Sequence, residues 1–302
     1  MLDIIKRKNL YFLISLIIII PGILSLFMFG LKLSIEFTGG SRTTFTFSKN
    51  VTTDTTNKVR QVFTNKEIEV ASVQPSGKNL IVRATPLTEK QNADIISSIR
   101  KFDNKAKQES FESIGPTIGA ETTKKAFYSV LLASLLIVLY ISISFRKVPK
   151  PTSSLRFGVC AILAVLHDVL VVIGVFSILG HFFNVEIDSL FITAILTVIG
   201  FSVHDTIVVF DRIRENLLKV NGVPFGTIVN NSILQTIVRS LNTSLTAMLV
   251  LLTLLIFGGA SVHWFVVALL IGIASGTYSS IFNAAPLLVT WHEWDQKRKK
   301  KV

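Results

Sequence analysis

The sequence SLFITAILTVIGFSVHDTIVVF, at residues 189–210, decides the fold. As a helix it would span roughly 33 Å, slightly more than the ~30 Å hydrocarbon core of a bilayer. Its only Asp, Glu, Lys or Arg residue is Asp205. The stretch therefore predicts a transmembrane helix that carries one acidic side chain inside the membrane.

Five further segments are long and apolar enough to cross a bilayer. They are residues 10–30, 126–145, 157–180, 240–258 and 264–291. The last segment is longer than a bilayer requires, so it extends past the membrane or tilts. The first has an apolar run longer than that of a signal peptide and no small-residue cleavage site after it, so we interpret it as an uncleaved anchor. The chain is thus expected to be a polytopic α-helical membrane protein with six transmembrane helices.

Composition agrees with a membrane protein. Half of the 302 residues are apolar, and the mean hydropathy is +0.57, although the formal charge is +12. Basic residues in such a chain are expected beside membrane spans rather than on a nucleic-acid surface, so no nucleic-acid partner is expected. The single cysteine, Cys160, lies in an apolar run and gives no information on redox compartment.

Orientation follows from the positions of the basic residues. Lys and Arg flank one side of the spans, whereas the two short loops at residues 181–188 and 259–263 have none. The basic residues are Lys6, Arg7, Lys8, Arg146, Lys147, Lys150, Arg156, Arg212, Arg214, Lys219, Arg239, Lys297, Arg298, Lys299, Lys300 and Lys301. The positive-inside rule places both termini, residues 1–9 and 292–302, and the loop 211–239 in the cytoplasm. Residues 31–125 then lie outside.

The external segment has the order β-α-β-β-α-β, which predicts a ferredoxin-like α/β domain. Strands are expected at residues 43–47, 68–73, 79–83 and 106–112, with a turn at Pro75-Ser76-Gly77 and a first helix from residue 53 to 63. Thr88 caps a second helix, to residue 101, with Gln91 as its capping-box partner. We find no nucleophile–base pair, metal spacing or phosphate loop here, so we interpret the domain as a docking or substrate-contacting module.

Two aspartates lie inside the spans and one arginine lies at the start of a span, and an ionised group at mid-bilayer costs roughly 2.5–3.5 kcal/mol to insert. Asp168 lies near the middle of the third span. Asp205 lies about 8 Å inside the cytoplasmic end of the fourth span, and Arg239 begins the fifth span from the same side. Asp205 and Arg239 are therefore expected at similar depth, where pairing would offset the desolvation of both.

These charges favour a proton relay, although simpler interpretations stand beside it. Arg239 shares a polar helix face with Asn242, Thr243 and Thr246, but its side chain is also long enough to snorkel to the headgroups. Asp168 is equally consistent with a structural hydrogen bond to a neighbouring helix. Asp205 has the strongest functional claim.

The dipeptides His167-Asp168 and His204-Asp205 raise a metal hypothesis. Adjacent helix residues point about 100° apart, so each dipeptide is a poor chelate, and we expect no metal site. Both histidines are assigned instead to the polar path of the aspartates. HExxH and GxSxG motifs are absent from the sequence, so no catalytic residue or cofactor is expected and the chain is not interpreted as an enzyme.

Packing signals complete the pattern. Gly272, Gly276 and Ser280 form a small-xxx-small face that favours close helix contact in the last span. Asn283 and Pro286 are expected to interrupt that span. Residues 224–238 are predicted to form a separate helix on the cytoplasmic surface.

Four stretches together resemble the SecF family of protein-export membrane subunits. Residues 204–216, which begin His204-Asp205, resemble the family's fourth-span signature. The stretch Glu36-Phe37-Thr38-Gly39-Gly40 resembles its acidic-Phe-x-Gly-Gly motif, and residues 165–169 and 239–246 resemble its third and fifth spans. His204 and Glu36 stand where the family commonly has Asn and Asp. A titratable His204 would leave open how the proton path is shared.

The resemblance implies one half of an RND-type assembly in the bacterial inner membrane, with SecD as the other half. Implied partners are SecD, the SecYEG translocon, YajC and YidC-type proteins, and a translocating preprotein. The pair would use proton or sodium motive force to help preproteins leave the translocon. The resemblance assigns ion coupling to Asp205 and Arg239, with a less defined role for Asp168. Gly39 and Gly40 are expected to give flexibility where the domain meets the membrane.

Two rival functions are less consistent with the sequence. A half-size exporter of drugs or lipids would need a large external region, and the one here is short. A purely structural subunit would gain nothing evident from membrane-inserted charges. We therefore favour an accessory subunit of protein export that is driven by an ion gradient.

Overall fold

The computed structural model describes residues 3–146, 148–149, 151–220, 222–259 and 261–299. Two compact units emerge: a helical bundle formed by the residues up to Lys32 and from Tyr128 onward, and a small domain, Leu33–Phe127. Four of the basic residues used to assign orientation, Lys147, Lys150, Lys300 and Lys301, lie outside the described residues.

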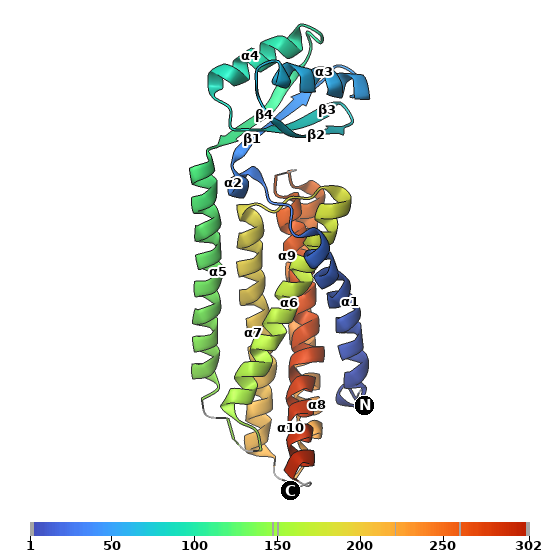
Figure 1. Ribbon diagram of the computed structural model, residues 1–302. Coiled ribbons are helices and arrows are strands. Elements are labelled where there is room, and N and C mark those ends of the chain that lie inside the picture. Colours follow the sequence, from blue (N-terminus) through green and yellow to red (C-terminus); the bar gives the residue numbers. More distant parts are fainter. Residues whose placement is uncertain (1–2, 147, 150, 221, 260, 300–302) are drawn as a thin grey trace. The chain divides into compact units, whose positions relative to one another are not determined.

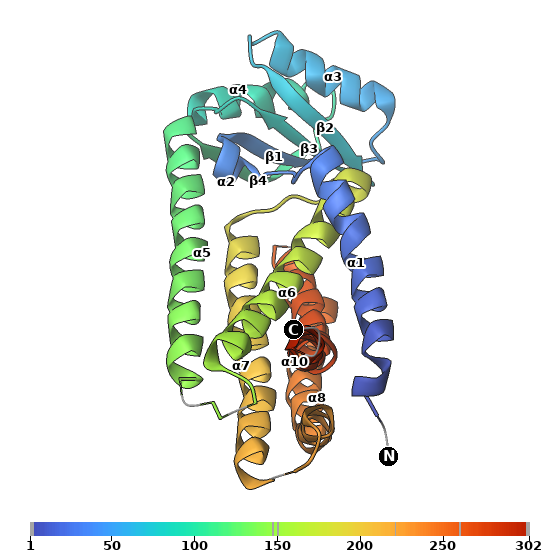
Figure 2. The same cartoon turned by 60° about the horizontal axis from the view of Figure 1, so that its bottom comes forward.

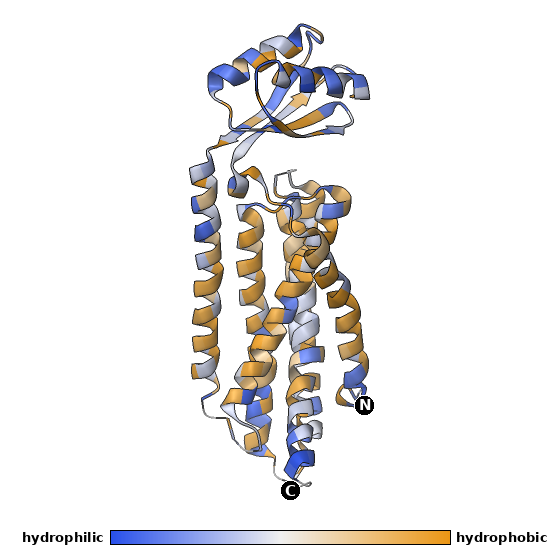
Figure 3. Cartoon of the chain, viewed as in Figure 1, coloured by the Kyte–Doolittle hydropathy of each residue, from blue (hydrophilic) through white to orange (hydrophobic). Residues whose placement is uncertain are grey.

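Six helices in the described residues are long and apolar enough to cross a membrane, which confirms the predicted number of spans. The helices are labelled in Figure 1, and residues of high hydropathy predominate along them (Figure 3). The helices are α1 (Lys8–Phe29), α5 (Pro116–Ser144), α6 (Ser154–Phe183), α7 (Ser189–Lys219), α8 (Phe225–Phe257) and the stacked pair α9 (His263–Ser279) and α10 (Ala285–Lys299). A single 3₁₀ turn, η1 (Ile5–Arg7), precedes α1.

Local sequence explains where several helices begin. Asp188 caps α7, because its carboxylate accepts a hydrogen bond from the backbone N–H of Phe191 at 2.9 Å. Pro116 opens α5, a position where its missing N–H costs no helical hydrogen bond. This helix therefore starts ten residues before the apolar run at 126, through a polar turn in which Glu121 pairs with Lys125 at 2.7 Å.

The predicted surface helix at residues 224–238 is wrong as a separate element. Residues 225–238 are the first part of α8, which continues unbroken into the fifth span. No proline or glycine separates the two parts, and Ile228, Val229 and Ile233 are buried in the core of the bundle. Since α7 also runs to Lys219, most of the predicted loop 211–239 is helical.

The last span is interrupted where Asn283 and Pro286 predicted, although the helix does not break. A π-helical segment, η2 (Ser280–Ala284), joins α9 to α10. Proline lacks the N–H that an α-helix would use at Pro286, and a π turn accommodates such a loss without ending the helix.

Close backbone approaches hold the bundle together. Helices α1 and α6 lie side by side at Gly22 and Gly174, where a Cβ added at Gly22 would lie 2.8 Å from the Cα of Gly174 (Figure 2). In the core of the bundle, the rings of Phe145, Phe157 and Phe210 pack with centroids 5.0–5.8 Å apart. These contacts connect α6 and α7 to the residue that follows α5.

The small domain has a four-stranded antiparallel sheet in the order β2-β3-β1-β4. Its strands are β1 (Gly40–Thr46), β2 (Val70–Ser76), β3 (Asn79–Ala84) and β4 (Lys107–Ile114). Helices α3 (Thr53–Thr64) and α4 (Glu89–Arg100) cover one face of the sheet (Figure 1). This is the predicted β-α-β-β-α-β order, and the sheet agrees with a ferredoxin-like domain.

Details of the domain differ slightly from the prediction. Pro75 and Ser76 belong to β2, and the turn is formed by Gly77, at φ +61°, and Lys78. The predicted capping box is confirmed: Thr88 accepts from the N–H of Gln91, and Gln91 accepts from the N–H of Thr88 at 3.0 Å. The core beneath the helices includes Phe45, Phe63, Leu80, Val82, Ile95 and Ile99.

Candidate functional site

Asp205 is buried in the middle of α7, with 2% of its surface exposed. Within the described residues a single hydrogen bond reaches its carboxylate, from the Ser244 hydroxyl of α8 at 3.4 Å. Ser244 in turn accepts a hydrogen bond from Thr277 of α9 at 2.5 Å. Asp205 thus lies where three helices meet, with few donors to stabilise a negative charge.

Two further buried hydroxyls lie close in the sequence to Asp205 and to Ser244, respectively. Thr206 follows Asp205 directly, and Ser240 precedes Ser244 by one helical turn on α8. Both side-chain oxygens are buried and lack a hydrogen-bond partner among the described residues. Unpaired buried hydroxyls are costly, so they are available to a group or water that enters the site.

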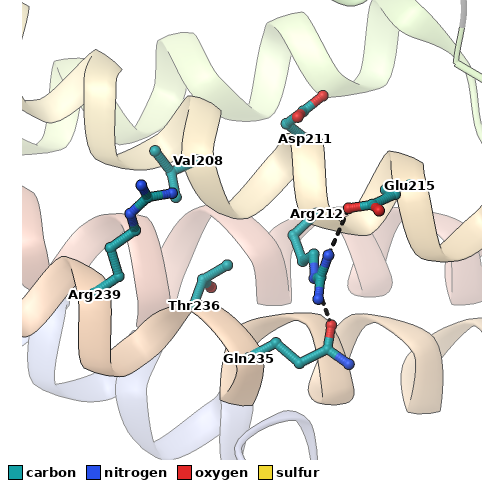
Figure 4. Close-up of a pocket in the computed structure, with 7 residues that line it drawn as sticks. All are labelled: Val208, Asp211, Arg212, Glu215, Gln235, Thr236 and Arg239. Carbon is teal, nitrogen blue, oxygen red and sulfur yellow. Dashed lines mark hydrogen bonds and ion pairs between the residues drawn. The ribbon is translucent and has the colours of Figure 1, made fainter.

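Arg239 is exposed on α8 and forms no ion pair with Asp205 in the described part of the chain. The two residues were expected at similar depth, where they could pair. Arg239 instead lines a cavity of about 350 Å³ between α7 and α8 (Figure 4). Its guanidinium extends toward Val208, which follows Asp205 by three residues. The backbone positions of Val208 and Asp205 are separated by about 4.5 Å along the helix axis, and Asp205 itself is not among the lining residues.

A polar network forms the rest of this cavity. Arg212 donates to Gln235 and to Glu215, each at 2.6 Å, and Asn216 donates to Gln235 at 2.9 Å. Asn216 ends the signature stretch at residues 204–216, whereas Gln235 and Thr236 were not among the residues predicted for a site. The signal that would have found Gln235 was its position four residues before Arg239, on the same helix face.

Asp168 has a different environment, since it is fully buried in α6 and richly hydrogen bonded. Its carboxylate accepts from the hydroxyls of Ser202, Ser275 and Ser279 at 2.6–2.7 Å, and lies 2.9 Å from His167 Nδ1. The serines come from α7 and α9, so Asp168 joins three helices. None of these three serines was identified from sequence.

The remaining candidates fall in several places. His204 lies on the exposed side of α7, next to Asp205 in the chain. Gly272 and Gly276 face α7: a Cβ at Gly272 would overlap the Val198 side chain, and one at Gly276 would lie 3.3 Å from the Cα of Ser202. No group of three or more metal-ligating residues occurs among the residues described.

The acidic-Phe-x-Gly-Gly motif belongs to the small domain, not to the bundle. Glu36 and Phe37 lie in the short helix α2 (Ile35–Thr38), capped by Ser34, and Phe37 is buried. Gly39 and Gly40 have φ values of +72° and +122°, which favour glycine. A Cβ at Gly39 would lie 2.9 Å from the Cα of Pro116. Conformation and close packing thus account for glycine here, and flexibility at these positions stays a prediction.

Two family models match this chain. The model for "Protein export membrane protein SecD/SecF, C-terminal" matches residues 94–294, and the model for the "SecD/SecF GG Motif" matches residues 24–51. The first match contains both buried aspartates, and the second contains Glu36, Phe37, Gly39 and Gly40.

Relatives agree with these matches. The chain is 47% identical to the protein translocase subunit SecF of Thermobaculum terrenum over 308 residues, which covers 98% of this chain and 95% of the relative. It is 33% identical to protein translocase subunit SecDF of Bacillus subtilis, covering 99% of this chain and 39% of that one.

A solved structure shares the fold. The crystal structure of SecDF, a translocon-associated membrane protein from Thermus thermophilus, matches with a TM-score of 0.82 and 33% sequence identity. The match covers 96% of this chain and 38% of the SecDF chain. Since a family model covers more than half of the chain and a SecF relative matches nearly all of it, the chain belongs to the SecD/SecF family of protein translocase subunits, which act in protein export.

Proposed function

We propose that this chain is the SecF half of a SecD–SecF pair of the bacterial inner membrane, and that it couples the proton motive force to late translocation and release of preproteins. In this proposal both termini are cytoplasmic and the small domain is outside. The six spans form one half of an RND-type assembly. SecYEG receives the preprotein, and YajC and YidC-type proteins belong to the wider complex.

The observation that carries the proposal is the environment of Asp205. A carboxylate in a membrane-spanning helix is costly when ionised and unpaired, because little water is available to solvate it. Asp205 is 2% exposed and has one hydrogen bond, at 3.4 Å. The free energy of Asp205 in such a site differs strongly between its protonated and its ionised form, which is the property that a coupling site needs.

The cavity beside Arg239 supports an entrance for the proton. Apart from Val208 its lining is polar or charged, and Val208 follows Asp205 by three residues on α7. A guanidinium at this position would favour the ionised form of Asp205 when the two approach and disfavour proton binding then. Movement of Arg239 toward and away from Asp205 would alternate the charge state of the carboxylate. Moving one charge through the membrane field is worth about 2.3 kcal/mol per 100 mV.

SecD is proposed as the partner that contacts the exposed face of α7. The SecDF proteins of Bacillus subtilis and Thermus thermophilus are about two and a half times longer than the matched region, so they carry further sequence in the same chain. An exposed row of small or polar residues runs along α7: Thr193, Thr197, Gly200 and His204. Such a row is unsuited to lipid and permits close helix contact, which favours a protein neighbour there.

The proposal is tested by Asp205→Asn, which keeps the shape of the side chain and removes its charge. We expect this variant to copurify with SecD in normal amount, while precursor proteins accumulate in cells that depend on it. Asp54→Asn, at an exposed carboxylate of α3 that pairs with Lys58, is the matched control and should export normally. Normal export by Asp205→Asn at normal expression would contradict the proposal.

A further inference from the structure

The carboxylate of Asp168 is saturated with hydrogen-bond donors. Oδ2 accepts from Ser202 and Ser279, each at 2.6 Å, whereas Oδ1 accepts from Ser275 at 2.7 Å and contacts His167 Nδ1 at 2.9 Å. Each carboxylate oxygen thus has two partners. A proton bound to the Asp168 carboxyl would have to displace one of these donors. Alternatively, one serine hydroxyl would have to rotate so that it accepts a hydrogen bond from the carboxyl group.

Such a shell favours the ionised form of Asp168. Hydrogen bonds donated to a carboxylate stabilise its charged state, and charge-assisted bonds are about twice as strong as neutral ones. Asp205 has the opposite surroundings, with a single long hydrogen bond. The two buried aspartates of the bundle therefore differ in the charge state that their neighbours stabilise.

Hydrogen bonds satisfy the Asp168 carboxylate, a nearby positive charge would stabilise it further, and one side chain can supply that charge. The His167 ring contacts Asp168, and 10% of the His167 side chain is exposed. A Nδ1–H donor would complete the four hydrogen bonds of the carboxylate. Protonation of the ring at Nε2 would then form a neutral imidazolium–carboxylate pair.

Other titratable groups around this pair do not replace His167. From α9, the Tyr278 ring stacks 6.4 Å from the His167 ring, and its hydroxyl donates to the carbonyl of Tyr11 on α1 at 2.8 Å. From α7, the nearest acidic group in sequence is Asp205, three residues after Ser202. Segment η2 has no titratable residue, and in α10 Glu293 and Asp295 pair with Lys8 and Arg156, while the His292 ring packs against the Phe225 ring at an interplanar angle of 51°.

The second ring nitrogen of His167 identifies where a proton could be gained or lost. Nε2 is buried and has no hydrogen-bond partner among the residues described. A buried nitrogen without a partner is costly in either charge state, so a water molecule or a moving side chain is expected to reach it. The orphaned atom thus lies on the far side of the ring from the carboxylate.

We propose that His167, and not Asp168, holds the proton at this second site of the bundle. Asp168 is a permanently ionised anchor, and Ser202, Ser275 and Ser279 are positioning residues that keep it ionised and fix the ring tautomer. The inference rests on the proposed function for the use of this proton in export. The charge states themselves are independent of that function.

The test is spectroscopic and uses the full chain in lipid bilayers. The histidine rings are labelled with ¹⁵N and the aspartate carboxyl carbons with ¹³C, and the sample is titrated by solid-state NMR. Asp168 is recognised by its dipolar contact with His167 Nδ1. We expect the His167 ring signals to shift between neutral and imidazolium values with pH, while the Asp168 carbon keeps its carboxylate shift throughout.

Variants separate the roles. His167→Asn retains an N–H donor for Asp168 and should lose the ring titration without changing the Asp168 signal. Removing both Oδ2 donors, in Ser202→Ala with Ser279→Ala, should let Asp168 protonate. Ser142→Ala, at an exposed serine of α5 that bonds its own helix, is the matched control and should change neither signal.

Two results would overturn the inference: a carboxylic-acid shift at Asp168 in the unsubstituted chain, or a His167 ring that keeps one charge state across the titration. The unsubstituted chain decides both, so the test does not depend on how well the variants fold. Either result would leave the role of Asp205 in export intact. Conversely, normal export by Asp205→Asn would contradict the proposed function but would leave the inference about the charge states of His167 and Asp168 unaffected.

Discussion

At the scale of the residue, hydroxyl groups decide how each buried carboxylate behaves. Sequence identifies Asp168 and Asp205 because an acid inside a membrane span is costly. It does not identify Ser202, Ser244, Ser275 or Ser279, because a serine in a helix commonly bonds its own backbone. Ser244, for example, donates to the carbonyl of Ser240 at 2.9 Å as well as to Asp205. Which hydroxyl reaches a neighbouring helix depends on helix rotation, and sequence does not encode this locally.

Glycine positions give a second residue-scale test. Gly272→Ala would push a methyl group into Val198, and overpacking of this kind costs about 1–3 kcal/mol. Gly200→Ala is the matched control, because a Cβ there meets nothing within 4 Å. We expect the temperature of thermal unfolding of the purified chain in detergent to fall for Gly272→Ala and to stay unchanged for Gly200→Ala. Equal stability of the two variants would contradict the close approach of α9 to α7.

Asp103, in the small domain, predicts a pH effect. Hydrogen bonds from the backbone N–H and hydroxyl of Ser48 and from the N–H of Lys105 hold the pKa of the Asp103 carboxyl below its usual value. Its stabilisation is therefore complete above the unfolded pKa of about 3.9 and is lost as pH falls through the lower folded value.

Asp103→Asn should remove this dependence and destabilise the domain at neutral pH by less than about 1 kcal/mol, since the site is exposed. Hydrogen exchange at the Ser48 amide of the full chain measures the effect. If the Ser48 amide exchanges at the same rate in Asp103→Asn and in the unsubstituted chain at neutral pH, Asp103 does not stabilise the segment around Ser48.

At the scale of the element, the sequence predicted the six spans better than the helices that contain them. The apolar run of the fourth span ends at Phe210, but Asp211, Arg212 and the residues to Lys219 continue the helix. Charged residues form helices readily, so hydropathy marks the membrane boundary and not the helix end. The separate surface helix at residues 224–238 was wrong for the same reason. The segment was predicted to lie on the cytoplasmic surface, whereas its apolar residues pack into the bundle core.

The π segment gives an element-scale prediction. Asn283 donates to Ser15 of α1 at 2.8 Å and accepts from the same hydroxyl at 3.1 Å, so η2 is joined to α1 by a reciprocal pair. Hydrogen bonds between membrane helices are worth about 0.6 kcal/mol on average and at most about 1.7. A double-mutant cycle of Ser15→Ala and Asn283→Ala, measured by unfolding in mixed micelles, should give a coupling energy in this range. Additive effects would show that the pair contributes nothing.

At the scale of the whole molecule, the helical bundle and the small domain are suited to different surroundings. The bundle exposes large apolar side chains along α1, α5 and α8, as lipid contact requires, whereas the small domain has its own buried core and polar helices (Figure 3). The positions of Lys and Arg predict the orientation, and the helices of the bundle do not test it. Orientation therefore needs its own measurement.

Cysteine labelling measures that orientation, with the buried Cys160 as a quiet background. Lys58→Cys lies on an exposed helix of the small domain, and Lys297→Cys lies in the basic last turn of α10. A membrane-impermeant thiol reagent applied to intact spheroplasts should label Lys58→Cys and leave Lys297→Cys unlabelled. Inverted membranes should give the reverse pattern. Labelling of Lys297→Cys in intact spheroplasts would contradict the cytoplasmic assignment of the C-terminus.

The central claim is that Asp205 carries the ion that drives export. Its most direct test is the release of precursor from the translocon in inverted membrane vesicles that contain this chain, SecD and SecYEG. Release is measured with and without an imposed proton gradient. The account predicts that the gradient accelerates late translocation with the unsubstituted chain and has no effect with Asp205→Asn. Equal acceleration with both would contradict it, and would mean that Asp205 is structural and that coupling lies elsewhere in the assembly.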